Sequence, residues 1–187
     1  MDYFSSPQFL QHRQRLAEQV DALPVAESVP GWSYRALTVG NAEYLGFTHT
    51  SDILLLVSSD EKSLIDTRDG SILARRPVEE GDIDESSLTC RGFDVLEGHR
   101  VQVAGLAGGG LPTGTPRGES VEMAWPSWPA GHLVFNPPWQ RYLVPQHSQG
   151  CTIVLRGFIR QFGFSWSGNT LVALDEDLHI WTRNTED

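Results

Sequence analysis

The chain has 187 residues, of which 40% are hydrophobic and 20% are charged, and its 24 acidic and 14 basic residues give a formal net charge of -10. This length predicts one domain covering residues 1–187, because single cores stop growing only beyond ~250 residues, and the apolar content excludes a disordered acidic tail. The charge disfavours nucleic acid as a partner. The only adjacent basic pair, Arg75 and Arg76, is closely followed by acidic residues, so the sequence indicates no basic patch for nucleic acid.

The first residues, 1–7, lack the basic and apolar regions of a secretory signal. A helix start is predicted near their end. The pattern of Ser5, Ser6, Pro7 and Gln8 combines a capping hydroxyl with proline in the first turn. A helix over 7–23 follows, ended by Pro24, with apolar residues at helical spacing. Its apolar stripe contains Phe9, Leu10, Leu16, Ala17, Val20 and Leu23.

The rest of the chain, residues 25–187, predicts a β domain, since short apolar runs alternate with turns rich in Gly and Pro. The expected strands cover residues 32–39, 44–48, 53–58, 63–66, 72–75, 88–93, 101–106, 121–124, 132–135, 152–158, 161–166, 170–174 and 178–182. An acidic loop over 79–87 and a glycine-rich surface loop or lid over 105–118 interrupt them. The fold class is therefore mainly β plus one N-terminal helix.

Two segments of the β domain are similar to each other. Residues 57–67 and 172–182 match at five of eleven positions without a gap, at a separation of 115 residues. Each predicts an apolar strand, a turn led by Asp60 or Asp175, and a second strand, which resembles the inner hairpin of a WD-type β-propeller blade. We expect a β-sandwich or meander sheet with such hairpins, capped by the helix. A small four-bladed propeller is the alternative, because only about four blades of ~40 residues would fit.

No familiar catalytic or metal-binding motif is present. The six histidines show no HxH or HExxH spacing and the chain has no GxSxG motif, so we expect no metal and no cofactor. His179 alternates with apolar neighbours and is expected on a solvent face. Cys90 and Cys151 lack CxxC spacing and are expected to be buried free thiols in a reducing compartment. No apolar run approaches the ~20 residues of a membrane span, which favours a cytoplasmic protein with no membrane partner.

Two segments are candidates for binding a protein partner. The acidic loop is either a solvated segment or a set of carboxylates that enters a basic cleft. These carboxylates are Glu79, Glu80, Asp82, Asp84 and Glu85. The Trp-Pro segment over 125–139 either fills a core or offers Trp125 and Trp128 as rigid interface anchors.

This layout of a small, acidic, cytoplasmic, loop-rich β domain resembles the immunity proteins of bacterial polymorphic or contact-delivered toxins. The resemblance implies a non-enzymatic inhibitor that binds a basic cognate toxin domain and occludes its substrate cleft through residues 79–85 and 105–118. Two alternatives stay open. One is a scaffold or adaptor module built on propeller-like hairpins, and the other is an enzyme whose site combines His49, Asp52 and His132.

Overall fold

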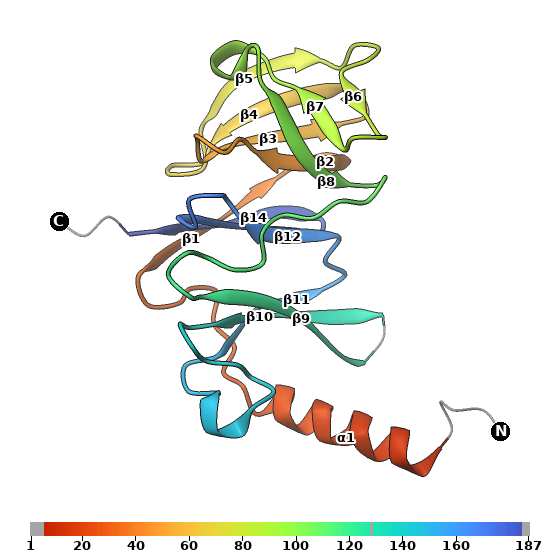
Figure 1. Cartoon of the computed structure of the whole chain (residues 1–187), viewed down its shortest axis with the longest axis vertical. Coiled ribbons are helices and arrows are strands. Elements are labelled where there is room, and N and C mark those ends of the chain that lie inside the picture. Colours follow the sequence, from red (N-terminus) through yellow and green to blue (C-terminus); the bar gives the residue numbers. More distant parts are fainter. Residues whose placement is uncertain (1–5, 128, 185–187) are drawn as a thin grey trace. The chain divides into compact units, whose positions relative to one another are not determined.

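The computed structural model describes residues 6–127 and 129–184 of the chain, and these residues are mainly β, as predicted (Figure 1). They divide into two compact units. The helix unit contains the residues up to Val29 together with Arg117–Ile159, and the sandwich unit contains Pro30–Pro116 together with the residues from Arg160 onward. Each unit is therefore assembled from segments that are distant in the sequence. That both belong to one domain stays a prediction.

The helix unit begins with α1 (Pro7–Asp21), which starts where the sequence predicts. The hydroxyl of Ser6 accepts a hydrogen bond from the backbone N–H of Phe9 at 3.3 Å, so the cap is formed by a side chain. The helix ends two residues earlier than expected. Leu23 precedes Pro24, and the residue before a proline is disfavoured in helical conformation.

The sheet of the helix unit is antiparallel, with α1 packed against it. Its strands, in spatial order, are β11 (Thr152–Gly157), β10 (Ala130–Asn136) and β9 (Ser120–Ser127). The predicted helix stripe is buried most deeply in its C-terminal half, since Leu10 is 52% exposed whereas Val20 is fully buried. The buried core of this unit contains Val20, Ala124, Val134, Tyr142, Cys151 and Ile153.

The sandwich unit contains a seven-stranded antiparallel sheet that curls into a half-barrel (Figure 1). Its strands, in spatial order, are β5 (Ile72–Pro77), β4 (Glu61–Asp66), β3 (Ile53–Ser58), β2 (Ala42–Phe47), β8 (Arg100–Gly105), β7 (Thr89–Arg91) and β6 (Ile83–Asp84). Leu54 and Leu56 belong to one core, whereas Leu55 and Val57 belong to a second core inside the curl. The uninterrupted apolar run of β3 follows from this burial on both faces.

A second, four-stranded antiparallel sheet of the same unit completes a β-sandwich. Its strands, in spatial order, are β1 (Trp32–Thr38), β14 (Asp177–Arg183), β13 (Thr170–Leu174) and β12 (Gln161–Phe164). Val172 and Ile180 share a core with Leu54 and Leu56 of the half-barrel. The sandwich expectation is confirmed and the propeller alternative is wrong, because the described residues form sheets of four, three and seven strands.

The two similar segments form equivalent hairpins, as predicted. β3 pairs with β4, and β13 pairs with β14, each across a turn that contains the matched aspartate, Asp60 or Asp175. The last matched residues, Thr67 and Thr182, also meet, since the hydroxyl of Thr182 donates to the carbonyl of Thr67 at 2.7 Å. The internal similarity therefore marks two hairpins whose ends touch within one unit.

Three local expectations need correction. The loop over 105–118 is anchored in its middle, because Leu111 is 8% exposed and lies in the sandwich core. The carbonyl of Pro112 also accepts a hydrogen bond from the N–H of Phe164 at 2.7 Å. The acidic segment was expected to be a loop throughout, but it contains strand β6, which pairs with β7. His179 was expected on a solvent face, but it is 8% exposed and therefore buried.

Both cysteines are free and fully buried, as predicted. Burial raises the pKa of the Cys90 thiol and of the Cys151 thiol to about 11. Both therefore stay protonated near neutral pH, which makes them poor nucleophiles. Within residues 6–127 and 129–184, no helix is long and apolar enough to cross a membrane.

Candidate functional site

The acidic segment, residues 79–85, is held by an ion pair in the interior of the half-barrel. The ammonium of Lys62 on β4 lies 2.8 Å from Asp82 Oδ2, and the two side chains are 1% and 2% exposed. Lys62 Nζ also donates to the carbonyl of Arg91 at 3.2 Å and lies 5.3 Å from the centroid of the Phe93 ring. The buried charge is thus surrounded by partners, which is the condition for tolerating it.

The backbone around Asp82 is fixed as firmly as its side chain. Asp82 Oδ2 accepts from the N–H of Glu79 at 2.8 Å, and the carbonyl of Asp82 accepts from the N–H of Arg91 at 2.8 Å. Burial alone would raise the pKa of Asp82, but the hydrogen bonds from Lys62 and from the Glu79 N–H outweigh it and leave the pKa below its usual value. Asp82 therefore anchors the segment from within. The expectation that Asp82 faces a partner needs correction, because its side chain is buried.

The other four carboxylates of the segment lie nearer the surface, where Glu79, Glu80 and Glu85 are exposed. Glu79 accepts a hydrogen bond from Arg76 at 2.8 Å, and Glu85 accepts one from the buried Tyr44 hydroxyl at 3.3 Å. These contacts restrict the carboxylates at the start and end of the segment.

Asp84 is held by a local cap. Its Oδ1 accepts hydrogen bonds from the hydroxyl of Ser86 at 2.6 Å and from the backbone N–H groups of Ser86 and Ser87 at 3.0 and 3.3 Å. These bonds lower the pKa of Asp84 to about 2, so the carboxylate is ionised at any physiological pH. The segment therefore presents negative charge from a backbone of defined shape.

The predicted aromatic anchors belong to the other compact unit. Trp125 lies on β9 of the helix unit and is 41% exposed. Trp128 lies outside the described residues. The acidic segment belongs to the sandwich unit, so the two candidate surfaces lie on different units.

The three residues of the enzyme alternative have separate surroundings. The ring of His49 stacks on Trp166 with centroids 3.9 Å apart, and Asp52 accepts a hydrogen bond from the Ser167 hydroxyl at 2.7 Å. His132 lies on β10 of the helix unit, where burial lowers its pKa. Among the described residues, no hydrogen bond joins His49 to Asp52. The sandwich unit therefore contains no linked acid–base pair at these positions.

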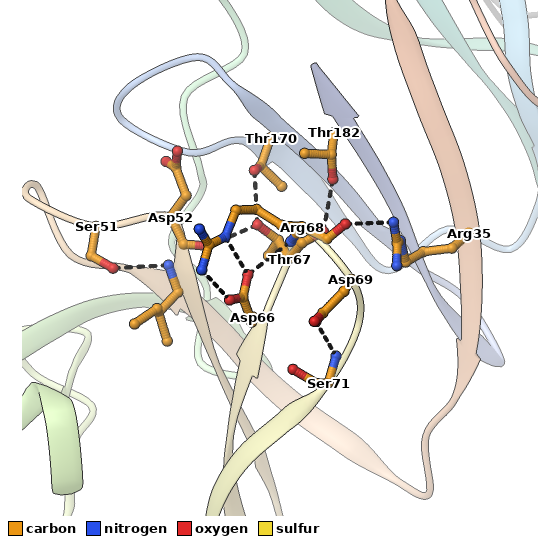
Figure 2. Close-up of polar contacts among 11 residues, drawn as sticks. Arg35, Ser51, Asp52, Asp66, Thr67, Arg68, Asp69, Ser71, Thr170 and Thr182 are labelled. Atoms are coloured by element: carbon orange, nitrogen blue, oxygen red, sulfur yellow. Dashed lines mark hydrogen bonds and ion pairs between the residues drawn. The ribbon is translucent and has the colours of Figure 1, made fainter. Parts of the chain in front are cut away.

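Figure 2 shows a polar network around the turn between β4 and β5. Arg68 donates to both carboxylate oxygens of Asp66, and Arg35 on β1 donates to the Arg68 carbonyl at 2.5 Å. Thr67 donates to the carbonyl of Asp52 at 2.9 Å. These bonds hold the turn in place, and those of Arg35 and Thr182 tie it to the four-stranded sheet.

Sequence reasoning missed a hydrogen-bonded chain around His179. The Tyr34 hydroxyl lies 2.9 Å from His179 Nδ1, and His179 Nε2 lies 3.0 Å from Asp175 Oδ1. A neutral imidazole satisfies both contacts when the phenol donates to Nδ1 and Nε2 donates to the carboxylate. The His179 ring also lies 6.1 Å from the ring of the fully buried Trp181. We infer that these hydrogen bonds allow a histidine on a strand to be buried, because they satisfy both of its ring nitrogens.

The sequence and the described residues provide no direct assignment of a function. No protein-family model matches the chain, and the comparison with curated proteins finds no match. Over the described ranges 6–127 and 129–184, no cluster of three His, Cys, Asp or Glu side chains has the geometry to hold a metal ion. The acidic segment, with its buried anchor and its ionised carboxylates, is the candidate site.

Proposed function

We propose that this chain is a non-enzymatic, immunity-type inhibitor that binds a basic toxin domain in the bacterial cytoplasm and occludes its substrate cleft. The observation that supports this proposal is that a buried ion pair anchors the acidic segment, with Lys62 Nζ 2.8 Å from Asp82 Oδ2. Glu79, Glu80, Asp84 and Glu85 would form the contact surface.

Two physical effects make such a segment suited to binding. Its backbone is already ordered, so binding does not carry the entropic cost of ordering it. Its ionised carboxylates, on a chain with a net charge of -10, would steer a basic partner toward the surface and speed association. Both effects favour a charged protein partner over a small substrate.

Partner capture from the native cell lysate tests the proposal. We compare the tagged wild-type protein with the variant Glu79→Gln, Glu80→Gln, Asp84→Asn, Glu85→Gln. The control variant, Glu18→Gln, Asp21→Asn, Asp60→Asn, Glu176→Gln, removes the same number of charges elsewhere. Wild type and control should retain one basic protein in stoichiometric amount. The segment variant should bind it at least about tenfold more slowly, with weaker salt dependence.

Inhibition is then measured on the captured protein itself. Its expression should arrest growth of a bacterial host, and co-expression of the wild-type chain should restore growth more fully than the segment variant does. Equal capture and equal rescue by the wild type and the segment variant would show that the acidic segment does not bind the partner. Retention of a partner that is not toxic would favour the scaffold alternative.

A further inference from the structure

A cavity of about 370 Å³ opens in the sandwich unit between the end of β1 and one face of strands β3 to β5. Its size falls within the range of about 300–1,000 Å³ that is typical of small-molecule sites. All its lining residues belong to one compact unit, and none belongs to the acidic segment. The cavity is therefore a feature separate from the proposed partner surface.

One part of the cavity is apolar. Leu37, Leu56 and Ile65 line it and also belong to the sandwich core or pack against it, so this wall is backed by packed side chains. Ile72 on β5 lines it as well and is 47% exposed, which places an apolar residue where solvent reaches the cavity. This part suits a compact apolar group.

The other part is polar and carries one charge of each sign. Glu61 and Ser63 lie two residues apart on β4, and Arg75 on β5 is the register partner of Ser63. Glu61 Oε1 accepts from the Ser63 hydroxyl at 3.2 Å and lies 3.5 Å from Arg75 Nε. The Glu61 and Arg75 side chains are 43% and 55% exposed, so the pair is solvated and easily opened.

Both charged groups have binding capacity left. In the described part of the chain, Glu61 Oε2 and the two terminal nitrogens of Arg75 take part in no hydrogen bond. A ligand with a single negative charge would meet Glu61 beside Arg75, and a ligand with a single positive charge would meet Arg75 beside Glu61. A head group that carries both charges complements the pair.

The turn between β4 and β5, whose polar contacts Figure 2 draws, forms one edge of this cavity. Gly70 lines the cavity and has a φ of +78°, a conformation that suits glycine. The next residue, Ser71, donates its N–H to Asp69 Oδ1 at 2.8 Å, and Arg35 holds the Arg68 carbonyl. A ligand would therefore enter a site whose edge is already ordered.

We propose that this cavity binds a small zwitterion with an apolar body, of the class of α-amino acids with a large apolar side chain. The ammonium group lies at Glu61, the carboxylate at Arg75, and the side chain against Leu56, Ile65 and Ile72. This inference stands independently of the proposed partner binding, because the two rest on different residues.

Three probes with one benzene ring and different head groups test the charge match. They are L-phenylalanine, 3-phenylpropionate and phenethylamine, and binding to the full chain is measured by ligand-observed NMR and calorimetry. We expect L-phenylalanine to bind at least about tenfold more tightly than either singly charged probe, since each lacks one charge-assisted contact. The absence of saturable L-phenylalanine binding, or equal affinity for all three probes, would overturn the proposal.

Paired variants assign the head-group contacts. Arg75→Gln should weaken L-phenylalanine and 3-phenylpropionate but not phenethylamine, whereas Glu61→Gln should weaken L-phenylalanine and phenethylamine but not 3-phenylpropionate. Arg76 and Asp60 are the sequence neighbours of Arg75 and Glu61 and do not line the cavity, so they supply the controls Arg76→Gln and Asp60→Asn. Equal losses in the controls would contradict the assignment.

A second variant pair tests the apolar contact. Ile72→Ser should weaken all three probes, and Leu73→Ser should not, because Leu73 is similarly exposed at 44% but does not line the cavity. Both substitutions are at partly solvated positions, and thermal unfolding checks that each variant is folded. Identical affinities in these two variants would place the ring outside the cavity.

Discussion

At the scale of single residues, the Lys62–Asp82 pair links stability to the candidate surface. Lys62→Met or Asp82→Leu alone leaves one charge buried without its partner, which is expected to lower the free energy of unfolding by about 3–5 kcal/mol. The double variant should lose far less, since two apolar side chains replace a desolvated pair. Urea unfolding of the four proteins measures the coupling, and additive losses would show that the two charges do not depend on each other.

The same pair gives a signature in pH. The folded pKa of Asp82 lies below its usual value, so its contribution to stability is complete above the unfolded pKa of about 3.9. That contribution is lost as pH falls through the lower, folded pKa. The free energy of unfolding should therefore fall more steeply below about pH 4 in the wild type than in the double variant.

At the scale of elements, local patterns in the sequence predicted much of the fold. The capping hydroxyl and proline located the start of α1, and the match between residues 57–67 and 172–182 identified two hairpins. Alternation failed where a strand is buried on both faces. Leu178, His179 and Ile180 are all buried. The imidazole of His179 can be buried because Tyr34 and Asp175 lie within hydrogen-bond distance of its two ring nitrogens.

The loop over 105–118 illustrates the same limit and yields a prediction. Its composition predicts a mobile surface segment, yet Leu111 packs in the sandwich core. Leu111→Ser should release the loop and raise its rate of cleavage by subtilisin about tenfold, since local opening governs such cleavage. Leu106→Ser is the control, because Leu106 is 73% exposed. Cleavage at equal rates in the two variants would mean that Leu111 does not hold the loop.

At the scale of the whole molecule, the division into two units could not be predicted from the sequence. The sandwich unit depends on pairing between β1 and β14, in which Trp32 faces Arg183. The helix unit joins α1 to strands that begin at Ser120. Periodicity and turn signals act over short ranges and do not specify such distant partners. The burial of Asp82 has the same origin, since Lys62 reaches it from strand β4, which is distant in the sequence.

We expect a basic partner to cover the acidic segment. Hydrogen–deuterium exchange of the purified chain, alone and in complex with the captured protein, measures this coverage. Peptides that contain residues 79–87 should exchange more slowly in the complex, while peptides from α1 serve as an internal reference. Protection of other peptides, with unchanged exchange over 79–87, would mean that the partner binds elsewhere on the molecule.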